Sequence, residues 1–126
     1  MARVLIIEDN PANMLLMAYL LKAFGHETLE ASSGAVGLEL AQTATPQIIL
    51  CDLQMPGIDG YEIAQRLKSD ASLKPIPSIA VTAYAMVGDR EKALAAGFDG
   101  YISKPISPES FVDEVEVFLR SASGAA

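Results

Sequence analysis

The sequence has one cysteine, one histidine and no tryptophan. Cys51 alone cannot form an intrachain disulfide, which excludes a disulfide-stabilised scaffold and fits a reducing compartment. The longest uninterrupted apolar run, residues 14–21, is far shorter than the ~20 residues that a membrane-spanning helix needs. A strand-like segment begins at Arg3 and leaves no room for a signal peptide. We therefore expect a soluble, cytoplasmic protein.

Basic residues are also scarce: 9 Lys and Arg stand against 16 Asp and Glu, giving a formal net charge of −7. Nucleic-acid binding draws most of its affinity from basic patches, so this balance argues against a nucleic-acid partner. It argues equally against docking to an anionic membrane. The length of 126 residues suits one domain, which we expect at residues 1–120, with a flexible tail at 121–126.

Five short apolar segments are separated by turn and cap residues. Two of them, Val-Leu-Ile-Ile at 4–7 and Ile-Ile-Leu-Cys at 48–51, are continuous rather than alternating, as expected of strands buried on both faces of a parallel sheet. The predicted strands are residues 4–7, 28–31, 48–51, 79–81 and 101–102.

Segments with helical periodicity lie between these strands. Asn10 is an N-cap candidate before Pro11, and Gly25 stops the first helix. The predicted helices are residues 11–24, 33–44, 59–69 and 89–96, with a fifth that starts at Ser107-Pro108 and buries Phe111, Val115, Phe118 and Leu119. Five strands alternating with five helices predict a doubly wound parallel α/β sandwich.

Charged and polar residues follow the predicted strands. Glu8 and Asp9 follow the first strand, Asp52 the third, Thr82 the fourth and Lys104 the fifth. Ligands of such sheets bind at the carboxyl ends of the strands. Carboxylates brought together there repel one another, and Mg²⁺, which prefers oxygen ligands, relieves this. An acidic surface cluster without a ligand is the alternative, although an ammonium across the crevice suits phosphoryl oxygens.

Two common phosphate sites do not fit these residues. No glycine-rich loop with Lys-Ser or Lys-Thr follows the first strand. A flavin phosphate would be repelled by Glu8-Asp9, where a flavodoxin-type site has hydroxyls and glycines. The chemistry that remains is transfer of a phosphoryl group onto a carboxylate, with Mg²⁺ and lysine neutralising charge.

Four motifs carry a family resemblance: Ile-Glu-Asp-Asn at 7–10, Cys-Asp-Leu-Gln-Met-Pro-Gly-Ile-Asp-Gly at 51–60, Val-Thr-Ala at 81–83 and Tyr-Ile-Ser-Lys-Pro at 101–105. Over residues 2–120 the chain resembles the CheY-like receiver domain of two-component response regulators. Within the family it is most similar to stand-alone regulators of the DivK kind. The resemblance implies a flavodoxin-like five-stranded parallel sheet of order 2-1-3-4-5.

The resemblance also implies the site. Asp52 would be the phosphoacceptor, attacking phosphohistidine on a sensor histidine kinase or a histidine phosphotransfer protein. Thr82 and Lys104 would contact the phosphoryl oxygens. The implied Mg²⁺ ligands are Asp9 and Asp52, the backbone carbonyl of Gln54, and Glu8 through a bound water.

Further implied roles concern switching. The bond before Pro105 would be cis, which proline permits. Thr82 and Tyr101 would form a switch pair that reshapes the face of the fourth helix, fifth strand and fifth helix, where a downstream protein would bind. Gln54 and Tyr84 would tune the lifetime of the phosphoryl group.

The first helix is more apolar than one buried face requires. We assign its core stripe to Leu16, Met17, Leu20, Leu21 and Phe24. We expect Met14, Leu15 and Ala18 to form an exposed patch beside Asp9 that docks the histidine-bearing partner, because apolar patches commonly mark interfaces. Packing against a neighbouring loop is the alternative. We expect His26, in the loop before the second strand, to be exposed.

The residues favour a phosphoacceptor signalling protein with intrinsic self-phosphorylation and autodephosphorylation, not an enzyme acting on a separate substrate. A haloacid-dehalogenase-type phosphatase would want a second acid where Gln54 stands. A scaffold without phosphotransfer disagrees with the retained acidic and lysine residues. The remaining alternative is a receiver domain of a hybrid histidine kinase or a longer regulator. The start close to the first strand and the short tail count against it.

Overall fold

The computed structural model describes residues 2–53, 55, 57, 59–83 and 88–122. Their strands form one parallel sheet with the order β2-β1-β3-β4-β5, which confirms the predicted topology. Neighbouring strands pair in parallel, for example Val4 with Thr28 and with Ile48. The strands are β1 (Arg3–Ile7), β2 (Glu27–Ala31), β3 (Ile48–Asp52), β4 (Ser78–Thr82) and β5 (Gly100–Ser103).

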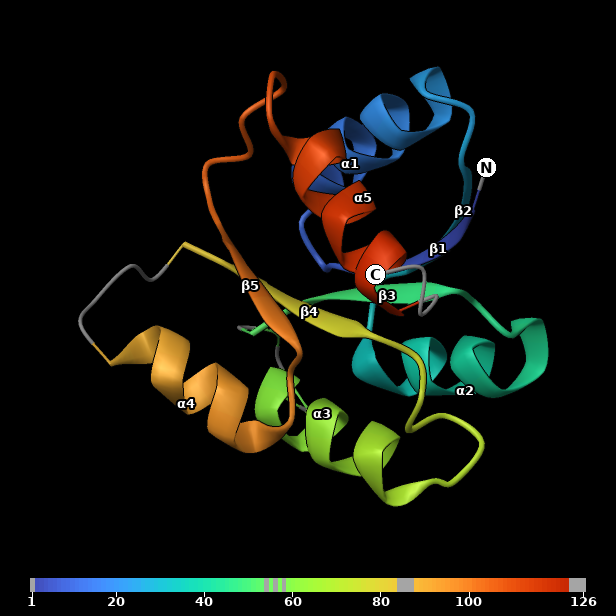
Figure 1. Cartoon of the computed structure of the whole chain (residues 1–126), viewed down its shortest axis with the longest axis vertical. Coiled ribbons are helices and arrows are strands. Elements are labelled where there is room, and N and C mark those ends of the chain that lie inside the picture. Colours follow the sequence, from blue (N-terminus) through green and yellow to red (C-terminus); the bar gives the residue numbers. More distant parts are fainter. Residues whose placement is uncertain (1, 54, 56, 58, 84–87, 123–126) are drawn as a thin grey trace.

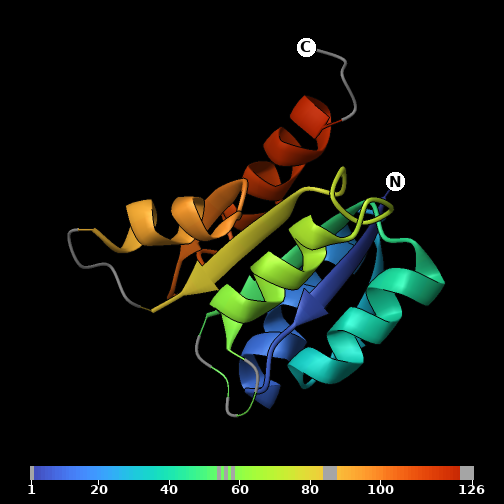
Figure 2. The same cartoon turned by 90° about the horizontal axis from the view of Figure 1, so that it is seen from below.

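Helices cover both faces of the sheet. The helices are α1 (Pro11–Ala23), α2 (Gly34–Ala44), α3 (Gly60–Ser69), α4 (Asp89–Ala96) and α5 (Phe111–Ala122). Figure 1 shows α1 and α5 on one face of the sheet and α2, α3 and α4 on the other. In Figure 2, α3 lies between α2 and α4. No helix in the described part of the chain is long and apolar enough to cross a membrane.

Local sequence signals set most of the helix starts. The Asn10 side chain accepts hydrogen bonds from the backbone N–H groups of Ala12 and Asn13, and that of Asp59 accepts one from Glu62. These side chains satisfy amide groups that the first helical turn leaves unpaired. The predicted start of α5 at Pro108 is wrong, because residues 108–110 form a turn and the helix begins at Phe111.

The hydrophobic core has two parts, one on each face of the sheet. Leu50 and Val81 pack beneath α1 and α5, whereas Cys51 and Ala80 pack beneath the other helices. Every residue of β3 and β4 is buried, as the continuous apolar pattern of the third strand predicted. Cys51 is a core residue, and burial raises the pKa of its thiol far above the usual range.

Two predictions about α1 are wrong. Met14 and Ala18 are only 9% and 4% exposed and pack in the core beneath α5. Leu15 is 72% exposed, as predicted, and Tyr19 is 68% exposed. Phe24, which we assigned to the core, is exposed as well. Because α1 is apolar on all sides, its periodicity does not reveal which face is buried.

The prediction that His26 is exposed is also wrong. His26 is buried, and its Nδ1 atom accepts a hydrogen bond from the backbone N–H of Ala2 at 3.1 Å. Its Nε2 atom lies 2.9 Å from Oε2 of Glu116 on α5. The loop sequence holds no sign of this partner, which is distant in the chain.

Candidate functional site

Three carboxylates converge where β1 and β3 end. Ile7 pairs with Cys51, so the residues that follow them, Glu8 and Asp52, emerge side by side. One oxygen atom from each of Glu8, Asp9 and Asp52 lies within 4.8 Å of the others. Glu8 and Asp52 are 1% and 6% exposed, whereas Asp9 is exposed. We call these three residues the acidic cluster; the sequence predicted that they meet.

Burial and polar contacts act in opposite directions on the pKa of Glu8. Its Oε2 atom accepts a hydrogen bond from the Asn10 backbone N–H at 3.1 Å, and its Oε1 atom lies 2.8 Å from Nζ of Lys104. Burial nevertheless raises the pKa of Glu8, since desolvation outweighs these two contacts and the nearby Asp52 carboxylate adds to the increase. The fold therefore disfavours the charged form of Glu8.

Lys104 reaches the cluster from the end of β5. Its backbone N–H donates to the Thr82 carbonyl at 2.7 Å, and the Lys104–Pro105 bond is cis, as predicted. The ammonium lies 3.5 Å from Oδ2 of Asp52, farther than from Glu8. The sequence led us to expect an ammonium on the far side of the crevice. In the structure, the Lys104 ammonium instead lies next to the carboxylates of Glu8 and Asp52.

The acidic cluster fits a divalent cation. Its donors are carboxylate oxygens, the ligands that Mg²⁺ prefers, and two of the three carboxylates, those of Glu8 and Asp52, are buried. A cation there would compensate the charge that burial and mutual repulsion leave unbalanced. Gln54, whose carbonyl we predicted as a further ligand, lies outside the described residues, and so does Tyr84.

Thr82 and Tyr101 lie on neighbouring strands. Thr82 is fully buried at the end of β4 and pairs with Ser103, while Ala80 pairs with Tyr101. Because side chains alternate along a strand, Thr82 and Tyr101 are on the same face of the sheet. The half-buried Tyr101 ring lines a groove of about 390 Å³ between α4, β5 and α5, with Arg90, Glu114, Val117 and Phe118.

A second groove, of about 450 Å³, adjoins the acidic cluster. Asp9, Pro11 and Leu15 line one side, and Glu30 and Ser32 line the other. Glu30 and Ser32 do not belong to a motif, so they were not predicted from the sequence. The implied strand order could have identified them, since it places the end of β2 beside the end of β1.

The fold and this set of side chains define a class of protein. A family model described as the response regulator receiver domain matches residues 4–116. The chain belongs to this family.

Among curated proteins, the chain is similar to the polar-differentiation response regulator DivK of Brucella ovis. The two are 44% identical over 119 residues, covering 94% of this chain and 97% of DivK. A CheY-like receiver domain protein from Methanospirillum hungatei has a TM-score of 0.89 at 25% identity, with 100% and 99% of the two chains covered.

A third similar protein is the receiver domain of a sensor histidine kinase from Pseudomonas aeruginosa. Its TM-score is 0.83 at 29% identity, with 98% of each chain covered. That structure is described as having a magnesium ion coordinated in its active site cleft.

Proposed function

We propose that this receiver domain accepts a phosphoryl group on Asp52 from phosphohistidine of a sensor histidine kinase or a histidine phosphotransfer protein. A carboxylate oxygen of Asp52 attacks phosphorus, the N–P bond of phosphohistidine breaks, and the imidazole takes up a proton as an acyl phosphate forms. The observation that carries this proposal is the position of Asp52, which is buried between two further carboxylates and within 3.5 Å of the Lys104 ammonium.

The acidic cluster would hold Mg²⁺ through Glu8, Asp9 and Asp52, with the Gln54 carbonyl as a further ligand. When bound, the cation neutralises charge on the transferring phosphoryl group. The magnesium ion in the cleft of the Pseudomonas aeruginosa receiver domain supports this part of the proposal. Lys104 and Thr82 would contact the phosphoryl oxygens, because Thr82 is the last residue of β4 and Lys104 follows β5, and both strands end at this crevice.

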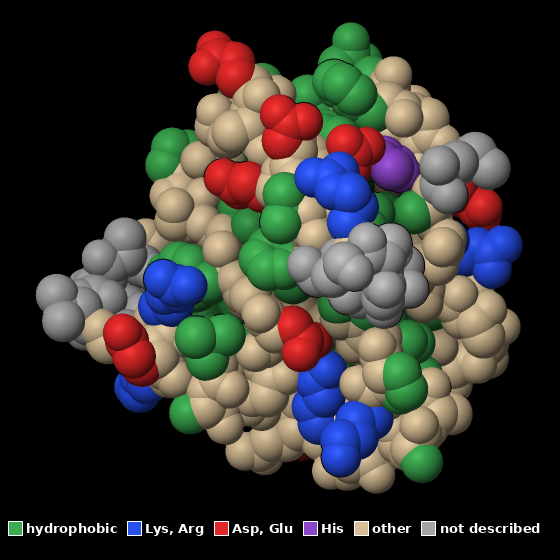
Figure 3. All heavy atoms as spheres, in the orientation of Figure 1, with side chains coloured by type: hydrophobic (Ala, Val, Ile, Leu, Met, Phe, Trp, Pro, Cys, Tyr) green, Lys and Arg blue, Asp and Glu red, His purple; other side chains and the backbone are tan. Residues whose placement is uncertain are grey.

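Phosphorylation would change the surface formed by α4, β5 and α5. Thr82 and Tyr101 share one face of the sheet. The Tyr101 ring can therefore change its position when Thr82 moves toward the phosphoryl group. Figure 3 shows acidic side chains over the α5 part of this surface, in agreement with the exposed Asp113 and Glu114. A downstream protein would bind there, and Gln54 and Tyr84 would tune the phosphoryl lifetime.

The histidine-bearing partner would contact Leu15 rather than the whole predicted patch. Leu15 is exposed on the groove that also contains Asp9, whereas Ala18 packs in the core. Met14 lines the groove but is too buried to be a main contact. Replacing Leu15 with glutamate should slow phosphotransfer from a partner protein while leaving phosphorylation by a small donor unchanged.

The site assignment is tested by incubating the protein with Mg²⁺ and acetyl phosphate and measuring its intact mass. We expect wild type to gain one phosphoryl group in Mg²⁺ and none in excess EDTA. Asp52→Asn should gain none. Asp59→Asn is the matched control, because asparagine also serves as an N-cap, and it should behave as wild type. A phosphoryl group on Asp52→Asn would contradict the proposal.

A further inference from the structure

The first residue of α3 lies against the backbone of the proposed phosphoacceptor. Gly60 is buried, and its N–H donates a hydrogen bond to the Leu53 carbonyl at 3.3 Å. A Cβ atom added to Gly60 would lie 2.7 Å from Cα of Leu53 and 2.8 Å from the carbonyl oxygen of Asp52, whereas ordinary contacts of a Cβ atom begin at 3.4 Å. Both atoms belong to the backbone, so no side-chain rotation can make room. Any residue larger than glycine therefore requires α3 or the Asp52–Leu53 peptide to shift.

The backbone conformation at position 60 does not require glycine. Glycine is needed for conformation where φ is positive. Gly60 is not among the described glycines with a positive φ, which are Gly25, Gly57, Gly88 and Gly97. Alanine is also the better helix former. The close approach of α3 to Asp52 is therefore what glycine provides here.

The helix is less free to shift than the peptide. The inner face of α3 is fully buried in the core and consists of Ile63, Ala64 and Leu67. The Asp59 side chain fixes the first turn, since it accepts the Glu62 N–H at 2.9 Å. In contrast, Asp52 is the last residue of β3, so the peptide that follows it leaves the sheet. A side chain at position 60 would therefore displace mainly the Asp52–Leu53 peptide.

We propose that Gly60 is a positioning residue for Asp52. Because the start of α3 contacts the Asp52–Leu53 peptide directly, it fixes the orientation of this peptide and with it the direction of the Asp52 carboxylate in the crevice. Reacting groups have to be held within about 0.5 Å of the productive geometry, so a small displacement of the peptide slows the attack on phosphorus. This inference rests on the proposed function.

A purely structural role is the competing explanation. If Gly60 served only to dock α3, a side chain at position 60 would lower the unfolding free energy but leave folded molecules fully reactive. If Gly60 positions Asp52, folded molecules accept the phosphoryl group more slowly. Reactivity and stability therefore have to be measured on the same variants.

The experiment follows the intact mass of the full chain over time in acetyl phosphate and excess Mg²⁺, after circular dichroism has shown which variants are folded. We expect Gly60→Ala to gain the phosphoryl group about tenfold more slowly than wild type, since a misplacement of about 1 Å can cost about a hundredfold. Gly100→Ala is the matched control, because its added Cβ atom would meet the Phe118 ring at the start of β5, away from Asp52. It should lose stability and keep the wild-type rate.

A second pair of variants tests the same contact without adding bulk at position 60. Asp59→Ala removes the N-cap and loosens the first turn of α3, whereas Asp59→Asn removes the same charge and keeps the cap. Asp59 is exposed, so both variants should fold. We expect Asp59→Ala to be phosphorylated about threefold more slowly than Asp59→Asn.

The inference is overturned if folded Gly60→Ala reacts at the wild-type rate, or if Gly100→Ala loses as much rate as Gly60→Ala. If Gly60→Ala does not fold, equal rates for Asp59→Ala and Asp59→Asn overturn it. A wild-type chain that gains no phosphoryl group on Asp52 contradicts the proposed function itself. A wild-type chain that reacts while Gly60→Ala keeps its rate loses only the inference.

Discussion

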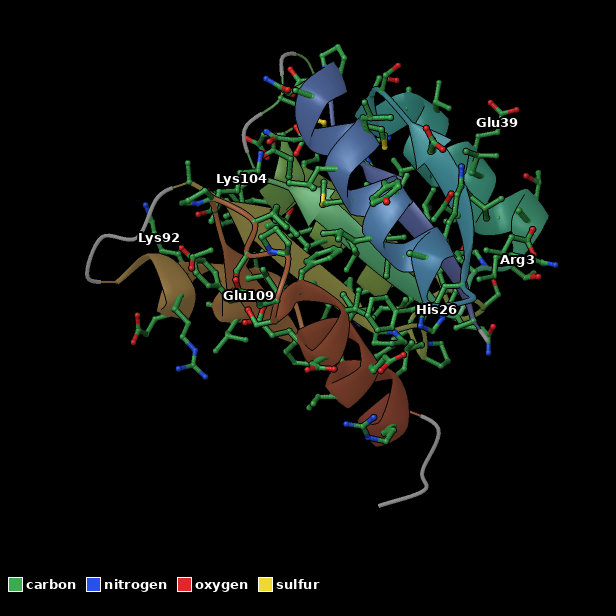
Figure 4. All side chains as sticks on the ribbon, turned by 90° about the horizontal axis from the view of Figure 1, so that it is seen from above. Arg3, His26, Glu39, Lys92, Lys104 and Glu109 are labelled. Atoms are coloured by element: carbon green, nitrogen blue, oxygen red, sulfur yellow. The ribbon has the colours of Figure 1, made fainter. Side chains whose placement is uncertain are left out.

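Charged residues are arranged differently at the two ends of the strands, which we call the amino edge and the carboxyl edge of the sheet. Figure 4 shows Lys104 and His26 near opposite ends of the molecule. At the amino edge, where the strands begin, charged groups have partners of opposite sign: Lys68 lies 2.9 Å from Asp99, and Arg3 lies 3.5 Å from Glu27. At the carboxyl edge, three carboxylates lie close together in the acidic cluster, and Lys104 contacts two of them, Glu8 and Asp52.

The amino edge is connected by polar contacts between distant segments. Oδ2 of Asp99 accepts the Ser78 backbone N–H at 2.8 Å as well as the Lys68 ammonium. Lys68 also donates to the carbonyls of Lys74 and Ile76. These contacts tie the end of α3 and the loop after it to the starts of β4 and β5. The polar contacts at the amino edge therefore stabilise the fold.

The carboxyl edge gives up stability. Burial raises the pKa of Glu8, which means that the fold disfavours its charged form. Groups with perturbed pKa values concentrate at functional sites, and such sites trade stability for activity. The comparison teaches that the same fold places its stabilising charge pairs and its reactive charges at opposite ends of the strands.

The largest effect is expected at Asp99. Replacing Asp99 with alanine leaves the buried Ser78 N–H and the Lys68 ammonium without this acceptor, so unfolding free energy should fall by about 2 kcal/mol. Asp99→Asn retains an oxygen acceptor and should lose less than half as much. Urea unfolding measures both variants. Equal losses would show that the charge of Asp99, not its role as acceptor for Ser78, matters.

A smaller loss is expected at His26. Nδ1 accepts the Ala2 N–H, so it carries no hydrogen, and Nε2–H donates to Glu116. His26→Phe removes both bonds and should cost about 1.5 kcal/mol. Glu116→Gln keeps an acceptor for a neutral imidazole and should cost less than about 0.5 kcal/mol. Urea unfolding compares them, and a large loss in Glu116→Gln would indicate a charged imidazole.

The opposite sign is expected at the carboxyl edge. Asp52→Asn removes one of the crowded carboxylates and leaves Lys104 on Glu8. Without added metal, its unfolding free energy should rise by about 1 kcal/mol, within the range of stabilising changes at functional sites. Thermal unfolding in EDTA provides the measurement. A destabilised Asp52→Asn would mean that the carboxyl edge is held together by Asp52 rather than strained by it.

The smallest effect concerns Asp70, at the end of α3. Hydrogen bonds from the Ser72 hydroxyl and backbone N–H lower the pKa of Asp70. A lowered pKa in the folded chain adds stability above the unfolded value of about 3.9 that is lost as the pH falls through the folded value. Asp70→Asn should thus have a lower unfolding free energy than wild type near neutral pH. This difference in unfolding free energy should become smaller below about pH 4. Urea unfolding at both pH values checks this, and a gap that is constant with pH would contradict it.

Much of the fold could be predicted because its signals are local. The continuous apolar runs at 48–51 and 4–7 identify buried strands, and Asn10 acts as the N-cap that its position indicates. The acidic cluster follows from the same logic, since the ends of parallel strands meet at one edge.

Apart from the start of α5, the errors concern contacts between distant segments. His26 is buried because α5 brings Glu116 to it, and Met14 is buried because α1 packs beneath α5. The residues that are adjacent in the sequence indicate neither of these contacts. The pairing of Lys104 with Glu8 was missed for the same reason, because its geometry depends on how three strand ends are placed.

The most direct test of the central claim locates the phosphoryl group on the chain. The protein is phosphorylated with acetyl phosphate and Mg²⁺, the acyl phosphate is reduced with borohydride, and the digested peptides are sequenced by mass spectrometry. Our account predicts homoserine at position 52 and unmodified Glu8 and Asp9. Reduction at either of those two residues, or at none of the three, would contradict it.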